Sequence, residues 1–346
     1  MNIPEFPSFD KASAEKAAQR QDQLTKPQGS LGRLEELSIQ LAGMTGRERP
    51  RFPRKAVIVM AADHGVALAG VSAYPVEVTA QMVANIARNG AAVSVLARQN
   101  QARVVVVDIG VATDVSGLTG VLHHKVADGS ANMLKGPALT PAQAEQAIAV
   151  GMQVLGEQAT QGLDLVALGE MGIGNTTPAS AITAVFTGLP VKDVTGRGTG
   201  LDDAGLQNKI KVIEEAIRLN QPDPGNALDV LMKVGGLDIA GLTGVIIAAA
   251  ARRIPVVVDG FISGAAALVA VGLLPAVRPY LIASHLSVEA GHAAICKQLN
   301  LEPLLDLRMR LGEGSGAVLA FPIIEGAARI LDEMATFAEA GVSTNA

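Results

Sequence analysis

The sequence predicts an α/β fold in which helices cover both faces of a mostly parallel β-sheet. Five short apolar runs recur along the chain, and they are continuous rather than alternating, which is typical of strands buried on both faces. Helical segments separate the runs, and strands that alternate with helices form βαβ units. The chain has 346 residues, 49% of them hydrophobic, which is enough for a large buried core.

The first 50 residues predict two helices that precede the sheet. Asp10 is a suitable N-cap for a helix that runs to about residue 24 and is stopped by the proline and glycine that follow. A second helix is expected over 31–44, with leucines on one face. The charged, proline-bearing link over 46–54 then marks a candidate domain boundary.

Strands and helices are expected to alternate from Lys55 onward. The strands are expected over 55–62, 103–109, 163–168, 255–258 and 280–283. The helices between and after them are expected over 76–98, 141–158, 178–187, 202–219, 236–252, 261–271 and 287–299. A last helical run, 315–340, is expected to pack on the N-terminal pair. The chain is thus divided into N-terminal helices (1–50), a large α/β domain with the substrate site (51–310), and a C-terminal segment that completes a small helical domain (311–346).

Composition excludes several classes of protein. A formal net charge of −5, 3% aromatic residues and no tryptophan argue against a nucleic-acid surface. The single cysteine, Cys296, rules out an internal disulfide and a cysteine-based zinc site, and it suits a reducing cytoplasm. The N-terminus has no apolar segment typical of a signal peptide. The apolar run over 262–277 is shorter than the ~20 residues of a membrane span, so a core helix is expected there.

Polar side chains follow each of the five expected strands. They are Asp63 and His64 after the first strand, Asp108 after the second, Glu170 after the third, Asp259 after the fourth, and Ser284 and His285 after the fifth. In open parallel sheets, ligands bind beyond the carboxyl ends of the strands, so this recurrence indicates an active site. The alternative is that every strand needs a polar exit turn.

The segment over 311–317 sets a single carboxylate, Glu313, among three glycines. Glycine permits a close approach of the backbone to a ligand and a positive φ. In a dry pocket the carboxylate would become more basic, which suits a general base. The alternative is a helix-entry turn with an exposed Glu313 near a positive helix end.

Three glycines over 169–174 come before an expected helix, and two of them are Gly172 and Gly174. Pro178 fits the first helical position, and Thr176 or Thr177 is the expected N-cap. Free N–H groups and the helix dipole at such a point suit a phosphate. The spacing does not match the dinucleotide fingerprint, and a plain glycine-rich turn is the alternative.

A second glycine cluster, over 194–201, contains Arg197 and precedes Lys209. These two cations are candidates for binding a phosphate or a carboxylate. A mobile, solvated loop remains the alternative.

The histidines and the segment over 71–82 give weaker signals. His285, Glu289 and His292 are spaced so that they share a face if they lie on one helix, but the pattern H-E-x-x-H is absent and no metal site is expected. The segment over 71–82 mixes apolar side chains with Ser72 and Gln81, which suits a flat, mostly apolar ligand that needs one or two hydrogen bonds. Core packing would look much the same.

Five motifs together carry a resemblance that covers the chain nearly end to end. They lie at 24–37 (LTKPQGSLGRLEEL), 62–66 (ADHGV), 169–177 (GEMGIGNTT), 195–200 (TGRGTG) and 311–317 (LGEGSGA). In these motifs, and in their order, the chain resembles the nicotinate-nucleotide:dimethylbenzimidazole phosphoribosyltransferases, enzymes of cobalamin lower-ligand assembly.

The resemblance implies a Rossmann-like parallel sheet with a small helical domain built from both chain ends. It also implies a homodimer, in which the neighbour's small domain closes the active site, and a transfer that needs no metal; no cofactor is expected, and the location expected from the single cysteine is cytoplasmic. The substrates implied are nicotinate mononucleotide and 5,6-dimethylbenzimidazole. Glu313 is the implied catalytic base, and Glu170 is expected near the ribose and the reacting centre.

Further site residues follow from the same resemblance. Those expected to bind the phosphate and ribose are Gly172, Gly174, Asn175, Thr176, Thr177, Lys209 and Asp259. Those expected to bind the acceptor base are Ser72, Gln81, Met82 and Leu311. Three alternatives stay open. The first is the same chemistry on another acceptor, which could be adenine, another benzimidazole or a phenolic. The second is a nicotinamide-dependent oxidoreductase, and the third is a non-catalytic nucleotide sensor.

Overall fold

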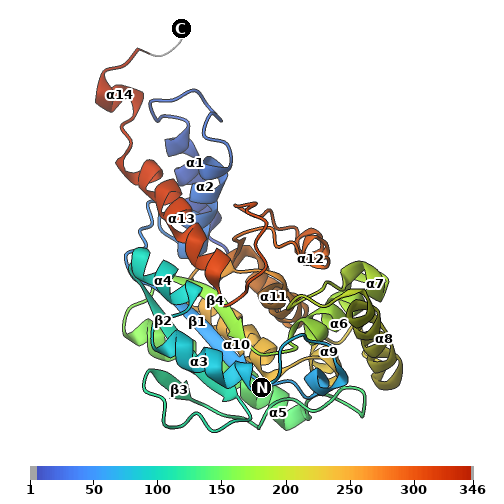
Figure 1. The fold of residues 1–346 in the computed structure, drawn as a ribbon. Coiled ribbons are helices and arrows are strands. Elements are labelled where there is room, and N and C mark those ends of the chain that lie inside the picture. Colours follow the sequence, from blue (N-terminus) through green and yellow to red (C-terminus); the bar gives the residue numbers. More distant parts are fainter. Residues whose placement is uncertain (1–5, 344–346) are drawn as a thin grey trace.

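The computed structural model describes residues 6–343, and its centre is a six-stranded β-sheet in the order β3-β2-β1-β4-β5-β6 (Figure 1). All five neighbouring pairs are parallel. The strands are β1 (Lys55–Ala62), β2 (Ala102–Gly110), β3 (Val121–His123), β4 (Leu165–Met171), β5 (Val256–Val258) and β6 (Leu281–Ala283). The predicted α/β class is therefore confirmed.

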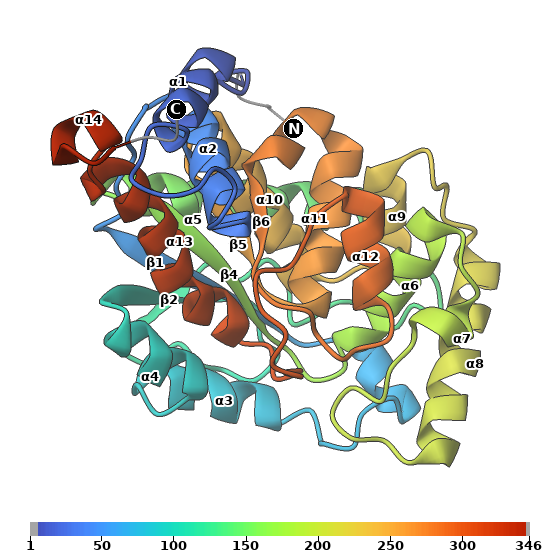
Figure 2. The ribbon, with the colours of Figure 1, turned by 90° about the horizontal axis from the view of Figure 1, so that it is seen from above.

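Helices cover both faces of this sheet, as predicted. Those before β4 are α1 (Lys11–Gln21), α2 (Arg33–Thr45), α3 (Val78–Ala87), α4 (Ala92–Gln99) and α5 (Pro141–Thr160). Those after β4 are α6 (Thr176–Thr187), α7 (Val191–Val194), α8 (Asp203–Asn220), α9 (Ala227–Val234), α10 (Leu237–Ala251), α11 (Phe261–Leu273), α12 (His292–Leu299), α13 (Ser315–Glu333) and α14 (Phe337–Ala340). Short 3₁₀ helices span Gly65–Ala69 and Pro275–Tyr280. Figure 2 shows α3, α4 and α13 on one side of the sheet and α5, α10 and α11 on the other.

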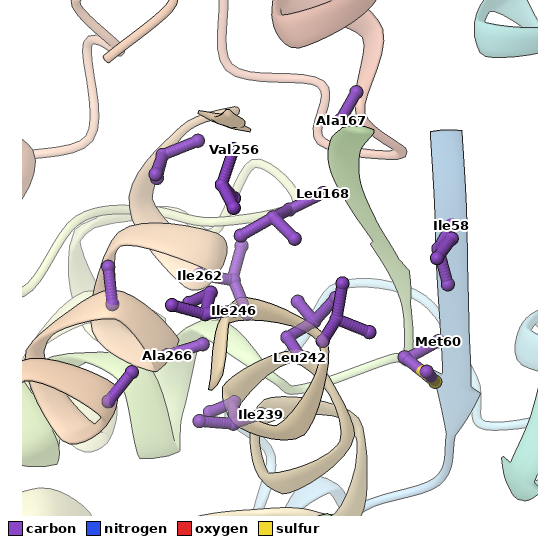
Figure 3. Close-up of a cluster of buried hydrophobic side chains, with 14 of the residues drawn as sticks. Ile58, Met60, Ala167, Leu168, Ile239, Leu242, Ile246, Val256, Ile262 and Ala266 are labelled. Carbon is purple, nitrogen blue, oxygen red and sulfur yellow. The ribbon is translucent and has the colours of Figure 1, made fainter. Parts of the chain in front are cut away.

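Helix α10 packs across the middle of the sheet, against β2, β1, β4 and β5. All eight residues of β1 are buried, as expected for a strand covered on both faces. Leu242 and Ile246 of α10 pack in the same cluster as Ile58 of β1 and Leu168 of β4 (Figure 3). Burial of such side chains stabilises the fold by about 1.5–3 kcal/mol each.

The two ends of the chain meet through α13, which packs against α1 and α2 as well as against the sheet (Figure 1). The guanidinium of Arg20 on α1 donates hydrogen bonds to the carbonyls of Leu331, Asp332 and Met334 at 2.7, 3.3 and 3.1 Å. These carbonyls have no partner within the helix, so Arg20 satisfies the C-terminal end of α13. The predicted packing of the C-terminal run on the N-terminal pair is thus observed.

The prediction of a single helix over 76–98 is wrong, because the structure has two helices there, α3 and α4, with a turn between them. Asn89 has a φ of 62°, in the left-handed region, and Gly90 follows it. Asparagine tolerates this conformation better than most residues and commonly ends helices. The apolar pattern continues through the turn because both helices face the same sheet.

The start of α6 also differs from the prediction. Its N-cap is Asn175, neither Thr176 nor Thr177, and Pro178 is the third helical residue. The N–H of Thr177 donates to the carbonyl of Gly174 at 3.0 Å, so the helical turn begins earlier than the proline suggests. The Asn175 side chain makes no cap bond, because it contacts two carboxylates instead.

Other differences concern short elements. The prediction missed β3, α7 and α9, and it joined α13 to α14. It also began α12 at residue 287 rather than at His292. The chain before His292 is held in a different conformation, because the N–H of Leu286 donates to the carbonyl of Leu305 at 2.7 Å.

No helix among the described residues is long and apolar enough to cross a bilayer. The apolar run that begins at Ile262 lies mostly in α11, which is a core helix as predicted. Residues 1–5 and 344–346, the outer ends of the two predicted terminal segments, lie outside the described residues.

Candidate active site

A cavity of about 700 Å³ lies at the carboxyl ends of β4, β5 and β6, beside α3 and the segment that leads into α13. Its lining residues are Tyr74, Val78, Met82, Glu170, Met171, Gly172, Ile173, Asn175, Thr176, Gly198, Thr199, Asp259, Gly260, Phe261, Ile262, Ser263, His285, Ser287, Glu289, Arg310, Leu311, Gly312 and Glu313. Polar residues after three of the five predicted strands thus meet in one cavity, where ligands bind in open parallel sheets.

Glu313 is presented by a turn of three consecutive left-handed residues. The φ angles of Gly312, Glu313 and Gly314 are 86°, 64° and 90°. Glycine adopts this conformation freely, but for Glu313 it costs on the order of 1 kcal/mol. Its side chain lies across the N-terminus of α4, where Oε2 accepts a hydrogen bond from the N–H of Val93 at 3.3 Å.

The carboxylate of Glu313 is sheltered from water, because the residue is only 5% exposed. Burial raises the pKa of Glu313 above its usual value, and the hydrogen bond from the N–H of Val93 opposes this rise. The alternative of an exposed glutamate in a helix-entry turn is therefore wrong. A carboxylate of raised basicity at a cavity wall suits proton removal from a ligand.

Glu170 stands next to Glu313 at the end of β4. Its Oε1 accepts the main-chain N–H of Glu313 at 3.3 Å, and its Oε2 accepts a hydrogen bond from Nδ2 of Asn175. Burial, reinforced by the charge of Asp238, raises the pKa of Glu170 to about 8, against the opposing effect of the Asn175 amide. These surroundings favour the protonated form of Glu170.

Asp259, after β5, holds the first turn of α13. Its carboxylate accepts the N–H of Ala317 at 2.8 Å and that of Gly314 at 3.3 Å. Burial raises the pKa of Asp259 to about 7 despite these hydrogen bonds, and the charge of Glu313 adds to the rise. Asp259 thus fixes the turn that presents Glu313.

The cavity is rich in carboxylates and poor in cations. The acidic residues that line it are Glu170, Asp259, Glu289 and Glu313. Among the described residues of the lining, Arg310 is the only lysine or arginine, and its Nη1 donates to the carbonyl of Gly198 at 2.8 Å. Such a site favours a ligand that carries positive charge at its buried end.

The glycine clusters and the start of α6 form another part of the wall. Thr176, Gly198 and Thr199 line the cavity, and Lys209 lies directly behind them, fully buried. Its Nζ is 2.5 Å from Oγ1 of Thr176. Burial lowers the pKa of Lys209 to about 8, although the charge of Glu289 acts in the opposite direction.

Three residues expected at the phosphate end do not line the cavity: Lys209, Gly174 and Thr177. Gly174 has a φ of 90°, and a Cβ there would lie 3.0 Å from Cβ of Ala67, so it shapes the loop. Thr177 is fully buried. Arg197 pairs with the exposed Asp203, away from the lining.

The residues expected to bind the acceptor base divide in two. An apolar wall of the cavity is formed by Met82, Leu311, Tyr74 and Val78. Ser72 and Gln81 are absent from the lining. Gln81 precedes Met82 on α3 and is turned from it by about 100°, so it faces solvent. The hydroxyl of Ser72 lies 3.0 Å from Oγ1 of Thr199.

The expectation that three residues share one helix face is wrong, because His285 and Glu289 precede α12 and only His292 belongs to it. Nδ1 of His292 accepts the N–H of Ser287 at 2.9 Å, and burial lowers the pKa of His292 to about 4. Within residues 6–343, no group of three histidine, cysteine or acidic side chains is arranged to hold a metal ion.

The sequence pattern missed several residues at or behind the cavity. They are Asp238, Ser287 and Arg310, whereas Glu289 was considered only with the histidines, and Tyr74 and Val78 only as part of the segment over 71–82. Asp238 had a signal, because it is the single charged residue of the otherwise apolar α10. A buried charge in such a helix needs a partner, which points to a polar cluster.

The geometry is that of an α/β enzyme whose buried carboxylates sit at the carboxyl edge of its sheet. A phosphoribosyltransferase family model matches residues 6–342, so the chain belongs to this family. A relative from Chloroflexus aurantiacus J-10-fl, named nicotinate-nucleotide–dimethylbenzimidazole phosphoribosyltransferase, is 61% identical and covers 99% of this chain and 97% of its own. A relative of the same name from Geobacter sulfurreducens is 54% identical, with 94% and 93% covered.

The fold has solved counterparts. The crystal structure of a protein with that name from Thermus thermophilus is similar with a TM-score of 0.92 at 45% identity, and the match covers 97% of this chain and 100% of the other. A structure described as CobT from the same organism gives a TM-score of 0.93 at 46% identity, with 96% and 100% covered. These similarities confirm the fold and the family that the motifs predicted.

Proposed function

We propose that this protein transfers the 5-phosphoribosyl group of nicotinate mononucleotide to 5,6-dimethylbenzimidazole, giving α-ribazole 5′-phosphate and nicotinate. The observation that carries the proposal is the sheltered carboxylate of Glu313, presented on its left-handed turn beside Glu170 at the wall of the cavity. The names of the relatives supply the two substrates.

In the proposed reaction one ring nitrogen of the benzimidazole attacks C1′ of the nucleotide. A C–N bond forms at C1′ while the bond from C1′ to the pyridinium nitrogen breaks, and its electron pair leaves with nicotinate. Attack from the opposite face inverts the β-nucleotide to the α-product. Positive charge builds on the benzimidazole, and Glu313 relieves it by taking the proton from the other ring nitrogen.

The acidic lining supports the other half of this reaction. The reacting nucleotide carries a pyridinium cation, and charge spreads to the ribose as the bond to nicotinate breaks. Ionised Glu170 and Asp259 stabilise such positive charge. A cation also lowers the pKa of a neighbouring carboxyl, so the bound substrate converts Glu170 to its ionised form.

We place the 5′-phosphate at Thr176, Gly198 and Thr199, with the ammonium of Lys209 behind them. The dipole at the N-terminus of α6 also favours a phosphate there. The acceptor base lies against the apolar wall formed by Met82 and Leu311. Contributions from Gly172, Gly174, Asn175 and Thr177, and from Ser72 and Gln81, stay predictions.

We further propose a cytoplasmic homodimer in which the neighbour completes the site, and a transfer that needs no metal or cofactor. Large apolar side chains are exposed around the cavity: Tyr74 is 56% exposed and Leu311 is 58% exposed, and both line it. Exposed apolar side chains of this size are typical of a surface that another protein chain covers. Light scattering after size-exclusion chromatography tests the dimer, and a monomer of full activity would contradict it.

The test of the function is incubation of the enzyme with nicotinate mononucleotide and a panel of acceptors, followed by mass spectrometry. The panel holds 5,6-dimethylbenzimidazole, benzimidazole, adenine and a phenol. We expect α-ribazole 5′-phosphate and an equal amount of nicotinate. A preference for another acceptor would correct the substrate, because one methyl contributes only about 1–3 kcal/mol of discrimination. Binding without release of nicotinate would overturn the enzymatic function.

A further inference from the structure

A buried chain of polar side chains runs away from the cavity behind Glu170. It begins with Asn175 at the start of α6, continues to Asp238 in the first turn of α10, and ends at His64 after β1. His64 and Asp238 are 2% and 0% exposed, and neither lines the cavity. Burial of a charged pair is costly, so its position beside a carboxylate of the cavity indicates a functional role.

The contacts in this chain are continuous. Nδ2 of Asn175 donates to Oε2 of Glu170 and lies 3.4 Å from Oδ2 of Asp238. Both protons of that one amide nitrogen thus have an acceptor. Oδ2 of Asp238 also lies 3.2 Å from Nε2 of His64. On its other side, Nδ1 of His64 lies 3.5 Å from Oγ of Ser130.

We propose that His64 and Asp238 are positioning residues that set the ionisation of Glu170 through Asn175. They touch no substrate and act through charge and through the orientation of one amide. Asp238 places a negative charge close to Glu170, which opposes ionisation, and protonated His64 compensates that charge. The inference rests on the proposed function, in which Glu170 must ionise beside a cationic nucleotide.

The electrostatic surroundings of both groups are consistent with this role. Burial alone would lower the pKa of His64, but the charges of Asp238 and Asp63 outweigh it and leave this pKa above its usual value. Glu170 faces Asp238 on α10, Asp259 after β5 and the Glu313 turn before α13. The basic groups that lie beside these carboxylates include His64, at 3.2 Å from Asp238, and His285, at 3.7 Å from Asp259.

Substitutions of His64 and of Asp238 should therefore shift the pKa of Glu170 in opposite directions. His64→Gln removes the compensating cation, so the pKa of Glu170 rises. Asp238→Asn removes the nearest anion, so the pKa of Glu170 falls. A purely structural role would not separate the variants in this way. Such a role is a real alternative, because a Cβ at Gly172 would lie 3.1 Å from Nε2 of His64, which packs under the loop.

The test is the affinity for nicotinate mononucleotide from pH 6 to pH 9, measured by isothermal titration calorimetry on the full-length variants. Affinity rises as Glu170 ionises, because the ligand carries a pyridinium cation. Glu170→Gln supplies the baseline, since it keeps the titrations of Lys209 and of the ligand's phosphate. The pH dependence of the affinity has a midpoint that we attribute to the ionisation of Glu170. We expect this midpoint to move up by roughly one pH unit in His64→Gln and down by a similar amount in Asp238→Asn.

Exposed residues supply matched controls. His123→Gln and Asp128→Asn make the same chemical changes at the surface and should leave the midpoint unchanged. The double variant His64→Gln/Asp238→Asn removes both charges, and its midpoint should lie below that of the parent. This variant tests the inference even where His64→Gln alone fails to fold.

The outcomes separate the inference from the proposed function. Shifts in the same direction, or no shift, in an enzyme that still forms α-ribazole 5′-phosphate would overturn the role of the pair and leave the function standing. If the parent forms no product, the function fails. Loss of activity in both variants with an unmoved midpoint would assign His64 and Asp238 a structural role only.

Discussion

The main-chain N–H of Glu313 donates to Oε1 of Glu170, so the carboxylate of Glu170 is joined to the backbone of Glu313 by one hydrogen bond of 3.3 Å. Glu170 therefore helps to hold the left-handed turn that presents Glu313. A change at either residue disturbs the other. We expect the effects of their substitutions on turnover to be non-additive, as for residues that act as one unit.

Glu313→Gln should lower kcat by roughly 10²–10⁴-fold, because a general base contributes about that factor. The KM for the acceptor base should change little, since the amide keeps the size and position of the side chain. Release of nicotinate, followed by chromatography, measures the effect. Glu302→Gln, at a side chain that is 74% exposed, is the matched control. Equal rates for Glu313→Gln and the parent would remove Glu313 from the mechanism.

The double variant Glu313→Gln/Glu170→Gln tests whether Glu170 partly replaces the missing base. If Glu170 replaces the base, or stabilises charge on the ribose as proposed, the double variant should be slower than Glu313→Gln alone. If Glu170 only supports the turn, the second substitution should add little further loss. Single-turnover rates of nicotinate release distinguish the two results.

Glu170→Gln should stabilise the empty protein, and more so as the pH rises. Burial raises the pKa of Glu170 from 4.5 to about 8, so between these values the folded state holds a proton that the unfolded state has lost. The stability linked to this group is fully present below about pH 4.5 and is lost as the pH rises through about 8. Glutamine lacks this loss, worth on the order of a few kcal/mol.

Thermal unfolding of both proteins at pH 5 and pH 8.5 provides the measurement. The difference in Tm, variant minus parent, should be larger at pH 8.5. The same gap at both values would mean that Glu170 is already ionised in the empty site.

Binding of nicotinate mononucleotide near pH 7 should release protons. The pKa of Glu170, about 8 in the empty site, falls when the pyridinium cation binds beside it. Calorimetry in buffers of different ionisation enthalpy counts the protons, and we expect up to about one from Glu170. Ribose 5-phosphate, which has the phosphate but no pyridinium, is the control ligand. Equal release with both ligands, or an unchanged count in Glu170→Gln, would contradict the assignment.

Much of the fold could be predicted because burial imposes a simple pattern on the sequence. The run over 55–62, which is apolar after Lys55, predicted the bounds of β1 as observed, since a strand covered on both faces consists almost entirely of apolar residues. The break between α3 and α4 was not predicted, because both helices keep an apolar face toward the sheet and the apolar pattern continues through the turn. Its local signal was Asn89 followed by Gly90. Three-residue β3, at the edge of the sheet, carries too short a pattern.

One part of the site could be predicted because its residues follow strands. Glu170, Asp259 and His285 all line the cavity because the carboxyl ends of parallel strands share one edge. Asp238 reaches the same cluster from the first turn of α10, through packing of that helix across the sheet. No spacing in the sequence encodes such a contact. Ser72 and Gln81 were expected at the cavity from the mixed polar and apolar pattern over 71–82, which does not show the direction of their side chains.

Gly169→Ala should lower kcat although it changes no polar group. A Cβ at Gly169 would lie 2.4 Å from the carbonyl oxygen of Glu313, closer than real Cβ atoms come, so the Glu313 turn must move away from β4. A displacement of that order costs catalysis heavily when a base must meet a proton in hydrogen-bond geometry. The same Cβ would lie 3.0 Å from Cγ2 of the buried Val59, so thermal unfolding of the variant is measured together with kcat.

Gly326→Ala is the matched control for this substitution. Gly326 lies within α13, and a Cβ there meets nothing within 4 Å. Alanine is favoured over glycine in a helix by about 1 kcal/mol, so this variant should keep its activity and gain slightly in Tm. Steady-state kinetics and thermal unfolding of both variants measure the contrast. If Gly169→Ala keeps the kcat of the parent, the position of the Glu313 turn against β4 does not limit the reaction, because the carboxylate then tolerates the displacement that the added methyl group forces on it.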